Sequence, residues 1–200
     1  TSRLRISAGC RPQADIRAPA DTGDAFYVVS PLKVVVLYVA TFGLYQMYWF
    51  YRHWLRWQAV HGVRVRPVVR AVFALFTVHA LARRIDEALR TAGVRRRWWP
   101  MAVATVFFLC EAVSWSTAFV GPSVAARWPA TTPWMDWLGI ALMPLACASL
   151  VRLQLAANAA CGDPQALRNR RFTVYNLLWI VGSVSVVAAA TVIVLRTHAG

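Results

Sequence analysis

Glu111 is the residue with the clearest potential for chemistry. It lies near the centre of the apolar stretch FFLCEAVSW, where an ionised carboxylate is costly unless it is protonated, paired or turned toward a polar interior. Ser114 follows at i+3 and would share its helix face. Two hypotheses follow: a site that handles protons or cations, or a structural hydrogen bond to Tyr45, Gln46 or Asn176 of other helices. We take Glu111, Ser114 and Asn176 as a candidate intramembrane polar site.

Other chemical signatures are missing from the sequence. His79 could titrate near neutral pH, but its surroundings are otherwise apolar. The motifs HExxH, GxSxG and GxGxxG and a Walker loop do not occur, and no His/Glu pair has metal-ligand spacing. We therefore expect no catalytic residue, metal or cofactor. The four cysteines form no CxxC pair and predict no disulfide framework, and the two in apolar stretches resemble small core residues: Cys10, Cys110, Cys147 and Cys161.

The composition is typical of a membrane protein. The 200 residues are 58% hydrophobic with a mean hydropathy of +0.47, and only 15% are charged, against about 25% in an average soluble domain. The charges gather between long apolar windows. The net charge of +14 comes from 21 arginines and one lysine. These arginines flank apolar stretches rather than lie on a soluble module, which argues against nucleic-acid binding.

The hydropathy pattern predicts an all-α, polytopic transmembrane helical bundle. The first apolar stretch has 21 residues with Lys33 as its only charge, follows a Ser30-Pro31 helix start, and closes in an aromatic belt. Gly43 in its middle could admit a close neighbouring helix. Residues 1–25 are expected to be a disordered polar tail, followed by a single membrane domain, 26–200. Four spans are predicted: 31–52, 98–120, 134–151 and 172–195.

Local signals set some of these boundaries. Gly121-Pro122 should end the second span, and Pro144 should kink the third. Residues 67–90 contain an apolar run of only 15 residues that includes Arg70 and His79. That is short for a span, so an interfacial helix or a re-entrant hairpin is expected.

The distribution of arginine predicts the orientation. With four spans, 15 arginines lie in the loops 52–97 and 152–171, and six lie on the other side. The positive-inside rule then places the two loops in the cytoplasm and both termini outside. If 68–82 also spans, the N-terminus is inside, with 14 arginines inside and six outside, so this alternative stays open.

Arginines near the aromatic belts are candidates for contact with anionic lipid headgroups or a protein partner. A homo-oligomer is a further hypothesis, because small residues in the second and fourth spans could support helix packing. The candidate contact residues are Arg52, Arg56, Arg83, Arg84, Arg95, Arg96 and Arg97.

Two stretches carry a resemblance to a known group. The segment SPLKVVVLYVATFGLYQMYWFYRHW and the later GDPQALRNRRFTVYNLLWIVG, with Asn169, Phe172, Thr173 and Asn176, resemble an uncharacterised bacterial inner-membrane protein family with a TFGLYxxYWFY first transmembrane helix. The resemblance covers about residues 26–195. It implies location and architecture, and it implies no activity, substrate or catalytic residue.

Three classes of function are consistent with this sequence. The leading hypothesis is a non-enzymatic membrane component that acts through protein or lipid contacts of its basic face. The second is a small transporter or channel component that uses Glu111. The third, a membrane-embedded enzyme, has no positive sign in the sequence.

Overall fold

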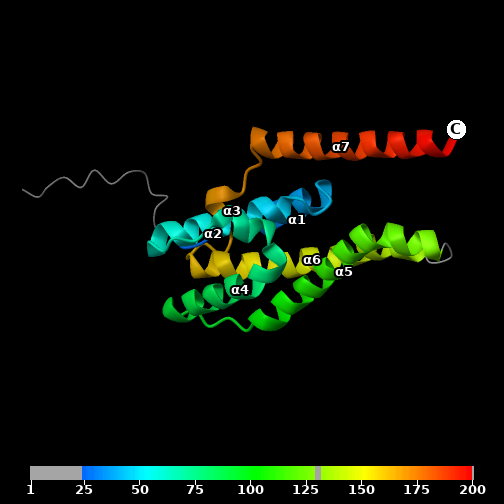
Figure 1. Cartoon of the computed structure of the whole chain (residues 1–200). Helices are drawn as coiled ribbons and strands as arrows, with labels where there is room; N and C mark the ends of the chain where they lie inside the picture. The colour runs from blue at the N-terminus through cyan, green and yellow to red at the C-terminus, as the bar shows by residue number, and fades with distance from the viewer. Residues whose placement is uncertain (1–23, 129–131, 200) are drawn as a thin grey trace, which may run out of the picture.

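The computed structural model describes residues 24–128 and 132–199, and the described chain is all-α (Figure 1). The predicted disordered tail lies outside the described residues up to position 23. Its last part is ordered, because Asp24 is held by Arg168. The helices are α1 (Pro31–Ala40), α2 (Tyr45–His61), α3 (Pro67–Val72), α4 (Ala74–Thr91), α5 (Pro100–Arg127), α6 (Thr132–Ala160) and α7 (Val174–Ala199), with a 3-10 turn, η2 (Leu167–Asn169).

The first apolar stretch is not a single helix, so the prediction of a continuous span over 31–52 is wrong. α1 ends in a Schellman motif: the Gly43 amide donates to the Tyr38 carbonyl (2.8 Å) and the Phe42 amide to the Val39 carbonyl (3.1 Å). Phe42 and Gly43 take left-handed φ values of +50° and +85°. The prediction that Gly43 sits inside a helix against a neighbour is also wrong, because Gly43 forms the turn.

After this turn the chain doubles back. Tyr38 and Gln46 both reach Glu111, while His53 of α2 lies beside Tyr27, which precedes α1, with ring centroids 6.1 Å apart. α1 and α2 therefore form a helical hairpin, called the first hairpin below (residues 31–61).

Residues 67–91 form a second hairpin. α3 and α4 meet at Phe73, whose φ of −94° is an ordinary value, and the Thr77 hydroxyl of α4 donates to the Arg70 carbonyl of α3 (2.8 Å). α4 then runs antiparallel to α5: His79 lies 3.1 Å from the Thr105 hydroxyl, and farther along Asp86 accepts from the Trp98 indole (3.1 Å). Residues 67–91 therefore form two helices joined at Phe73.

α5 and α6 form a long antiparallel pair. In the described part of the chain these two helices are long and apolar enough to cross a membrane, over Pro100–Gly121 and Trp137–Ala160. The predicted end at Gly121-Pro122 is wrong, since α5 continues to Arg127. α6 also extends beyond the predicted 134–151, and Pro144 lies inside it. Continuing a helix keeps the backbone groups hydrogen-bonded, which here overrides the local breaking tendency of Gly and Pro.

α7 stands apart from the rest of the bundle. It packs against α1, and in Figure 1 its C-terminal end points to the same side as the last turns of α5. Its first turn is capped by Asn176, whose Oδ1 accepts from the amide and hydroxyl of Thr173 (both 3.0 Å). Its described apolar part, Val174–Val186, is shorter than a span. Four spans are therefore not confirmed.

An extended segment before α1 is clamped by amide side chains. The buried Asn158 donates to the Val29 carbonyl (3.0 Å) and accepts from the Val29 amide (3.3 Å). Gln154, one turn earlier on α6, donates to the Tyr27 carbonyl (2.9 Å) and accepts from Trp49 of α2. These bonds replace the missing helical partners of residues 27–29 and fix where the first hairpin begins.

Asn169 is the third amide side chain of this clamp, and it also binds Lys33, the only lysine of the chain. Its Nδ2 donates to the carbonyl of Val28 (3.0 Å), and its Oδ1 accepts from Lys33 Nζ (2.8 Å). Lys33 also donates to the Arg171 carbonyl (2.9 Å) and is only 2% exposed. The charge inside the first apolar stretch therefore joins α1 to the loop that precedes α7.

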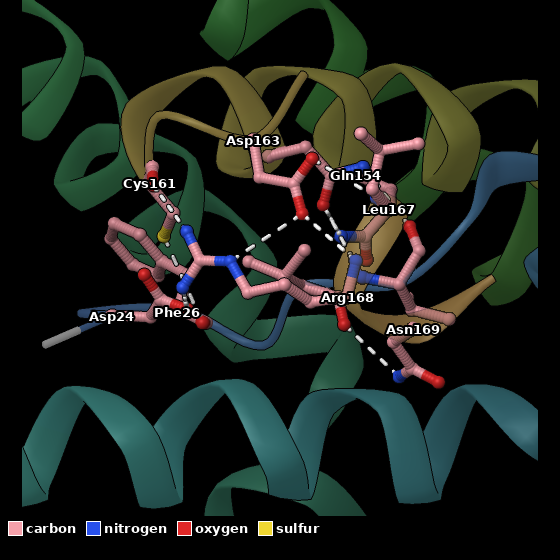
Figure 2. A network of polar contacts seen from close by, with 11 residues as sticks. Asp24, Phe26, Gln154, Cys161, Asp163, Leu167, Arg168 and Asn169 are labelled. Carbon is pink, nitrogen blue, oxygen red and sulfur yellow. Dashed lines mark hydrogen bonds and ion pairs between the residues drawn. The ribbon is translucent and has the colours of Figure 1, made fainter. Parts of the chain in front are cut away.

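Arg168 ties the N-terminal segment to the same loop, as Figure 2 shows. Its guanidinium bonds Asp24 (2.7 Å), lies 3.6 Å from Asp163 and donates to the Cys161 carbonyl (3.3 Å). Asp163 in turn accepts from the backbone amides of Leu167 (3.0 Å) and Arg168 (3.2 Å). Asp24 therefore lies at the same end of the molecule as the α6–α7 loop.

Candidate functional site

Glu111 lies in the middle of α5 at the point where the turns of both hairpins arrive. It is buried, at 7% exposure, and three neutral donors reach its carboxylate. The Tyr38 hydroxyl bonds Oε1 (3.2 Å), while Gln46 Nε2 (2.8 Å) and Trp115 Nε1 (3.2 Å) bond Oε2. In the described part of the chain, no cationic side chain forms an ion pair with it. The described hydrogen bonds to this carboxyl group therefore come from neutral groups only.

The turn of the first hairpin places two of these donors. Thr41 caps both helices there: its hydroxyl donates to the Leu37 carbonyl (2.7 Å) and accepts from the Tyr45 amide (2.9 Å). Tyr38 is in the last turn of α1 and Gln46 is in the first turn of α2. Because the chain reverses between them, both side chains approach the same carboxylate.

The second hairpin brings its turn to the other side of the same group. Val72, Phe73 and Ala74 line a cavity of about 280 Å³ together with Gln46 and Glu111. A second cavity of about 390 Å³ adjoins the turn of the first hairpin. Gln46, Met47, Glu111 and Trp115 line both cavities. The carboxylate therefore stands between two largely apolar spaces, one at each turn.

The structure brings together only part of the predicted polar site. Ser114 lines the larger cavity, although its hydroxyl donates to the Cys110 carbonyl (2.8 Å). Asn176 caps α7 and makes no described bond to Glu111. Of the proposed structural partners, Gln46 binds Glu111, whereas the buried Tyr45 hydroxyl has no partner among the described residues.

Two partners of Glu111 escaped the sequence analysis. Trp115 lies at i+4 on the same helix, a spacing that could have predicted the contact. Tyr38 had no such signal, because it reaches Glu111 only when the first apolar stretch reverses direction. His79, the other titratable candidate, contacts Thr105 and the ring of Phe108 and has no described bond to Glu111.

The predicted headgroup arginines lie toward one end of the molecule. Arg52 donates to the Tyr48 hydroxyl (2.9 Å) and covers the ring of Tyr27, and Arg97 lies over Trp99. Arg96 donates to the Leu155 carbonyl (3.4 Å). Arg83 and Arg95 are exposed, and Arg56 is partly buried with a partner. Of the 17 arginines in the described residues, 15 lie in segments 52–97 and 152–171. The other two, Arg127 and Arg196, belong to the last turns of α5 and α7, which extend to the opposite side in Figure 1.

Arg70 and Arg84 form an unusual pair at this basic end. The Arg70 guanidinium lies over the ring of Trp54 (4.2 Å to the centroid), and that of Arg84 lies over Trp57 (3.8 Å). Burial and the nearby charge of Arg84 lower the pKa of Arg70. No described carboxylate pairs with either residue, and Arg84 Nε and Trp54 Nε1 are buried donors without a described acceptor.

Among the described residues, no group of three His, Cys, Asp or Glu side chains could hold a metal ion. Comparisons with family models, with curated proteins and with solved structures found no match for this chain.

Proposed function

We propose that the chain is a non-enzymatic, multi-pass component of a bacterial inner membrane whose basic end binds anionic lipid headgroups. The observation that carries this proposal is the concentration of 15 of 17 described arginines in segments 52–97 and 152–171. Anionic phosphates on a membrane surface attract such clusters. The resemblance to an inner-membrane family through the TFGLYQMYWFY segment supports the same location.

The proposal includes a topology of three spans and two re-entrant hairpins. α5, α6 and α7 would cross the bilayer, while the first and second hairpins would enter it from the basic side and return. Under the positive-inside rule the basic end faces the cytoplasm. This topology places residue 24 in the cytoplasm and the end of α7 outside.

The Arg70–Arg84 pair supports lipid binding at a defined place. Two like charges held on tryptophan faces repel each other, and buried donors without acceptors are costly. A phosphate oxygen between them would relieve both effects. Arginine suits this role because its planar fork binds phosphate through two parallel hydrogen bonds.

Thermal unfolding in detergent with added lipid tests the proposal, since a ligand that binds the folded state stabilises it. Phosphatidylglycerol should raise the melting temperature of the wild type more than phosphatidylcholine does. The double variant Arg70→Gln/Arg84→Gln should lose most of this difference. The matched control, Arg127→Gln/Arg196→Gln, removes the same charge from the opposite end and should keep it. Equal stabilisation by both lipids would refute the proposal.

A second candidate function is a small transporter or channel component. The observation that favours it is the convergence of two hairpin turns on Glu111, because interrupted helices within a membrane commonly line substrate or ion sites. Proteoliposomes should then show a pH-dependent flux that Glu111→Gln abolishes. Flux no greater than that of protein-free vesicles, over a broad panel of ions and solutes, would remove this function.

A further inference from the structure

We infer that the Glu111 centre is a binding site for a lipophilic organic ammonium ion, that is, an amine with a protonated nitrogen and an apolar body. This inference names a ligand class for the second candidate function and rests on it for biological meaning. The site itself is defined by equilibrium binding, so binding and flux can fail independently.

The charge of the site points to a cation. Glu111 is the only charged residue among the described residues that line either cavity. Its three hydrogen bonds come from neutral groups. A carboxylate accepts about four such bonds, so one position remains for a donor. A cation there would neutralise the buried charge, which no described side chain does.

Gln46 indicates that this cation carries N–H groups. Its Nε2 is committed to Glu111, and its Oε1 is a buried acceptor without a partner among the described residues. The residue is 8% exposed and lines both cavities. An ammonium with two N–H groups can bond Glu111 and Gln46 Oε1 together, which satisfies the orphan acceptor.

The residues that line the larger cavity favour a ligand with an apolar part over a bare metal ion. The larger cavity, about 390 Å³, has the size of a small-ligand pocket. Tyr38, Phe42 and Trp115 provide aromatic walls that attract organic cations. A hard metal cation needs about six oxygen ligands, and so many oxygen-bearing side chains do not gather here.

Binding of 4-fluorophenethylammonium, followed by ¹⁹F NMR with the full chain in phosphatidylcholine nanodiscs, tests the inference. The zwitterionic lipid avoids attraction of the probe to the bilayer. The ammonium should bind saturably above empty nanodiscs, whereas the neutral 4-fluorophenethyl alcohol should not. This comparison needs only the wild-type protein, so it remains decisive if a variant fails to fold.

Two variants and a control locate the site. Glu111→Gln should weaken ammonium binding at least about tenfold, because a charge-assisted hydrogen bond is lost. Gln46→Met, of similar volume, removes both the orphan acceptor and the amide that donates to Glu111, and should weaken it about threefold to tenfold. Glu87→Gln makes the same change at the other glutamate of the chain, which is exposed, and should leave affinity unchanged.

Three results would overturn the inference: no saturable binding to the wild type, equal binding of the alcohol, or wild-type affinity in Glu111→Gln. If the ammonium binds as expected and no flux is seen in proteoliposomes, the transport function fails and the site stands. If flux depends on Glu111 while no amine binds, the transport function stands and the ligand class is wrong.

Discussion

The first and second hairpins both reverse the direction of the chain, but they do so through different backbone conformations and different contacts. Each consists of two helices whose turn lies beside Glu111. The first reverses through left-handed φ values at Phe42 and Gly43 and is tied by side chains to distant parts of the chain. The second reverses at Phe73 without a left-handed residue, and its α3 is only six residues long. An apolar stretch long enough to span can therefore turn back if polar partners hold its ends.

The largest expected effect concerns the membrane face from which each residue is accessible. This measurement tests directly whether the first hairpin returns to the side from which it entered. In a cysteine-free background, Gly62→Cys and a tag before Thr1 should be accessible from one membrane face, and Ser123→Cys from the other. The reason is that a hairpin returns to its own side, whereas a span does not. Labelling by a membrane-impermeant maleimide in vesicles of both orientations measures this. Accessibility of the tag from the face of residue 123, opposite to residue 62, would mean that the first stretch crosses.

The Asn158 bonds that hold the segment before the first hairpin should contribute more to stability than the bond between α3 and α4 in the second hairpin. Asn158→Ala leaves the amide and carbonyl of Val29 buried without partners, at roughly 1–3 kcal/mol for each group. We expect a loss of roughly 2–6 kcal/mol, read as a lower melting temperature in detergent. Thr77→Ala removes the bond between α4 and α3 and a longer contact with the Ala74 carbonyl and should cost about 0.5–1.5 kcal/mol. Similar losses in both variants would show that the hairpins are held equally.

The turn of the first hairpin should be sensitive to backbone conformation. Gly43→Ala forces a residue with a side chain to φ +85° and should cost about 1–2 kcal/mol. The added Cβ would meet the Tyr38 ring at 3.6 Å, an ordinary contact, so the penalty comes from the backbone. Gly182→Ala, in a helix with open space around it, should be neutral or slightly stabilising. A tolerated Gly43→Ala in the same melting assay would argue against the reversal.

The smallest effect concerns the bond between the first hairpin and α5. Tyr38→Phe removes the hydroxyl that donates to Glu111 and should lower stability by about 0.5–1.5 kcal/mol. Tyr51→Phe serves as the control, since no described hydrogen bond involves its hydroxyl. If both substitutions shift the melting temperature equally, the bond to Glu111 does not hold the hairpin.

Much of the helical pattern could be predicted from the sequence. Pro31 is the predicted helix start at α1, and the predicted ranges 67–90 and 98–120 begin within two residues of α3 and α5. The isolated Glu111 stood out because a carboxylate is rare in an apolar stretch. The sequence could not predict that Tyr38 bonds Glu111 or that Lys33 joins α1 to the loop before α7. It also could not predict the clamp formed by Asn158 and Asn169. Each joins positions tens of residues apart or more, and one sequence does not state which distant residues meet.

The sequence by itself determined composition, charge distribution and where apolar helices can form, because these depend on residue type and local spacing. Only the tertiary structure decided that residues 31–61 form a hairpin. Hydropathy measures how much a segment favours an apolar environment and contains no information on its direction. That direction depends on Asn158, Asn169 and Glu111, whose hydrogen bonds reach the segment from far along the chain.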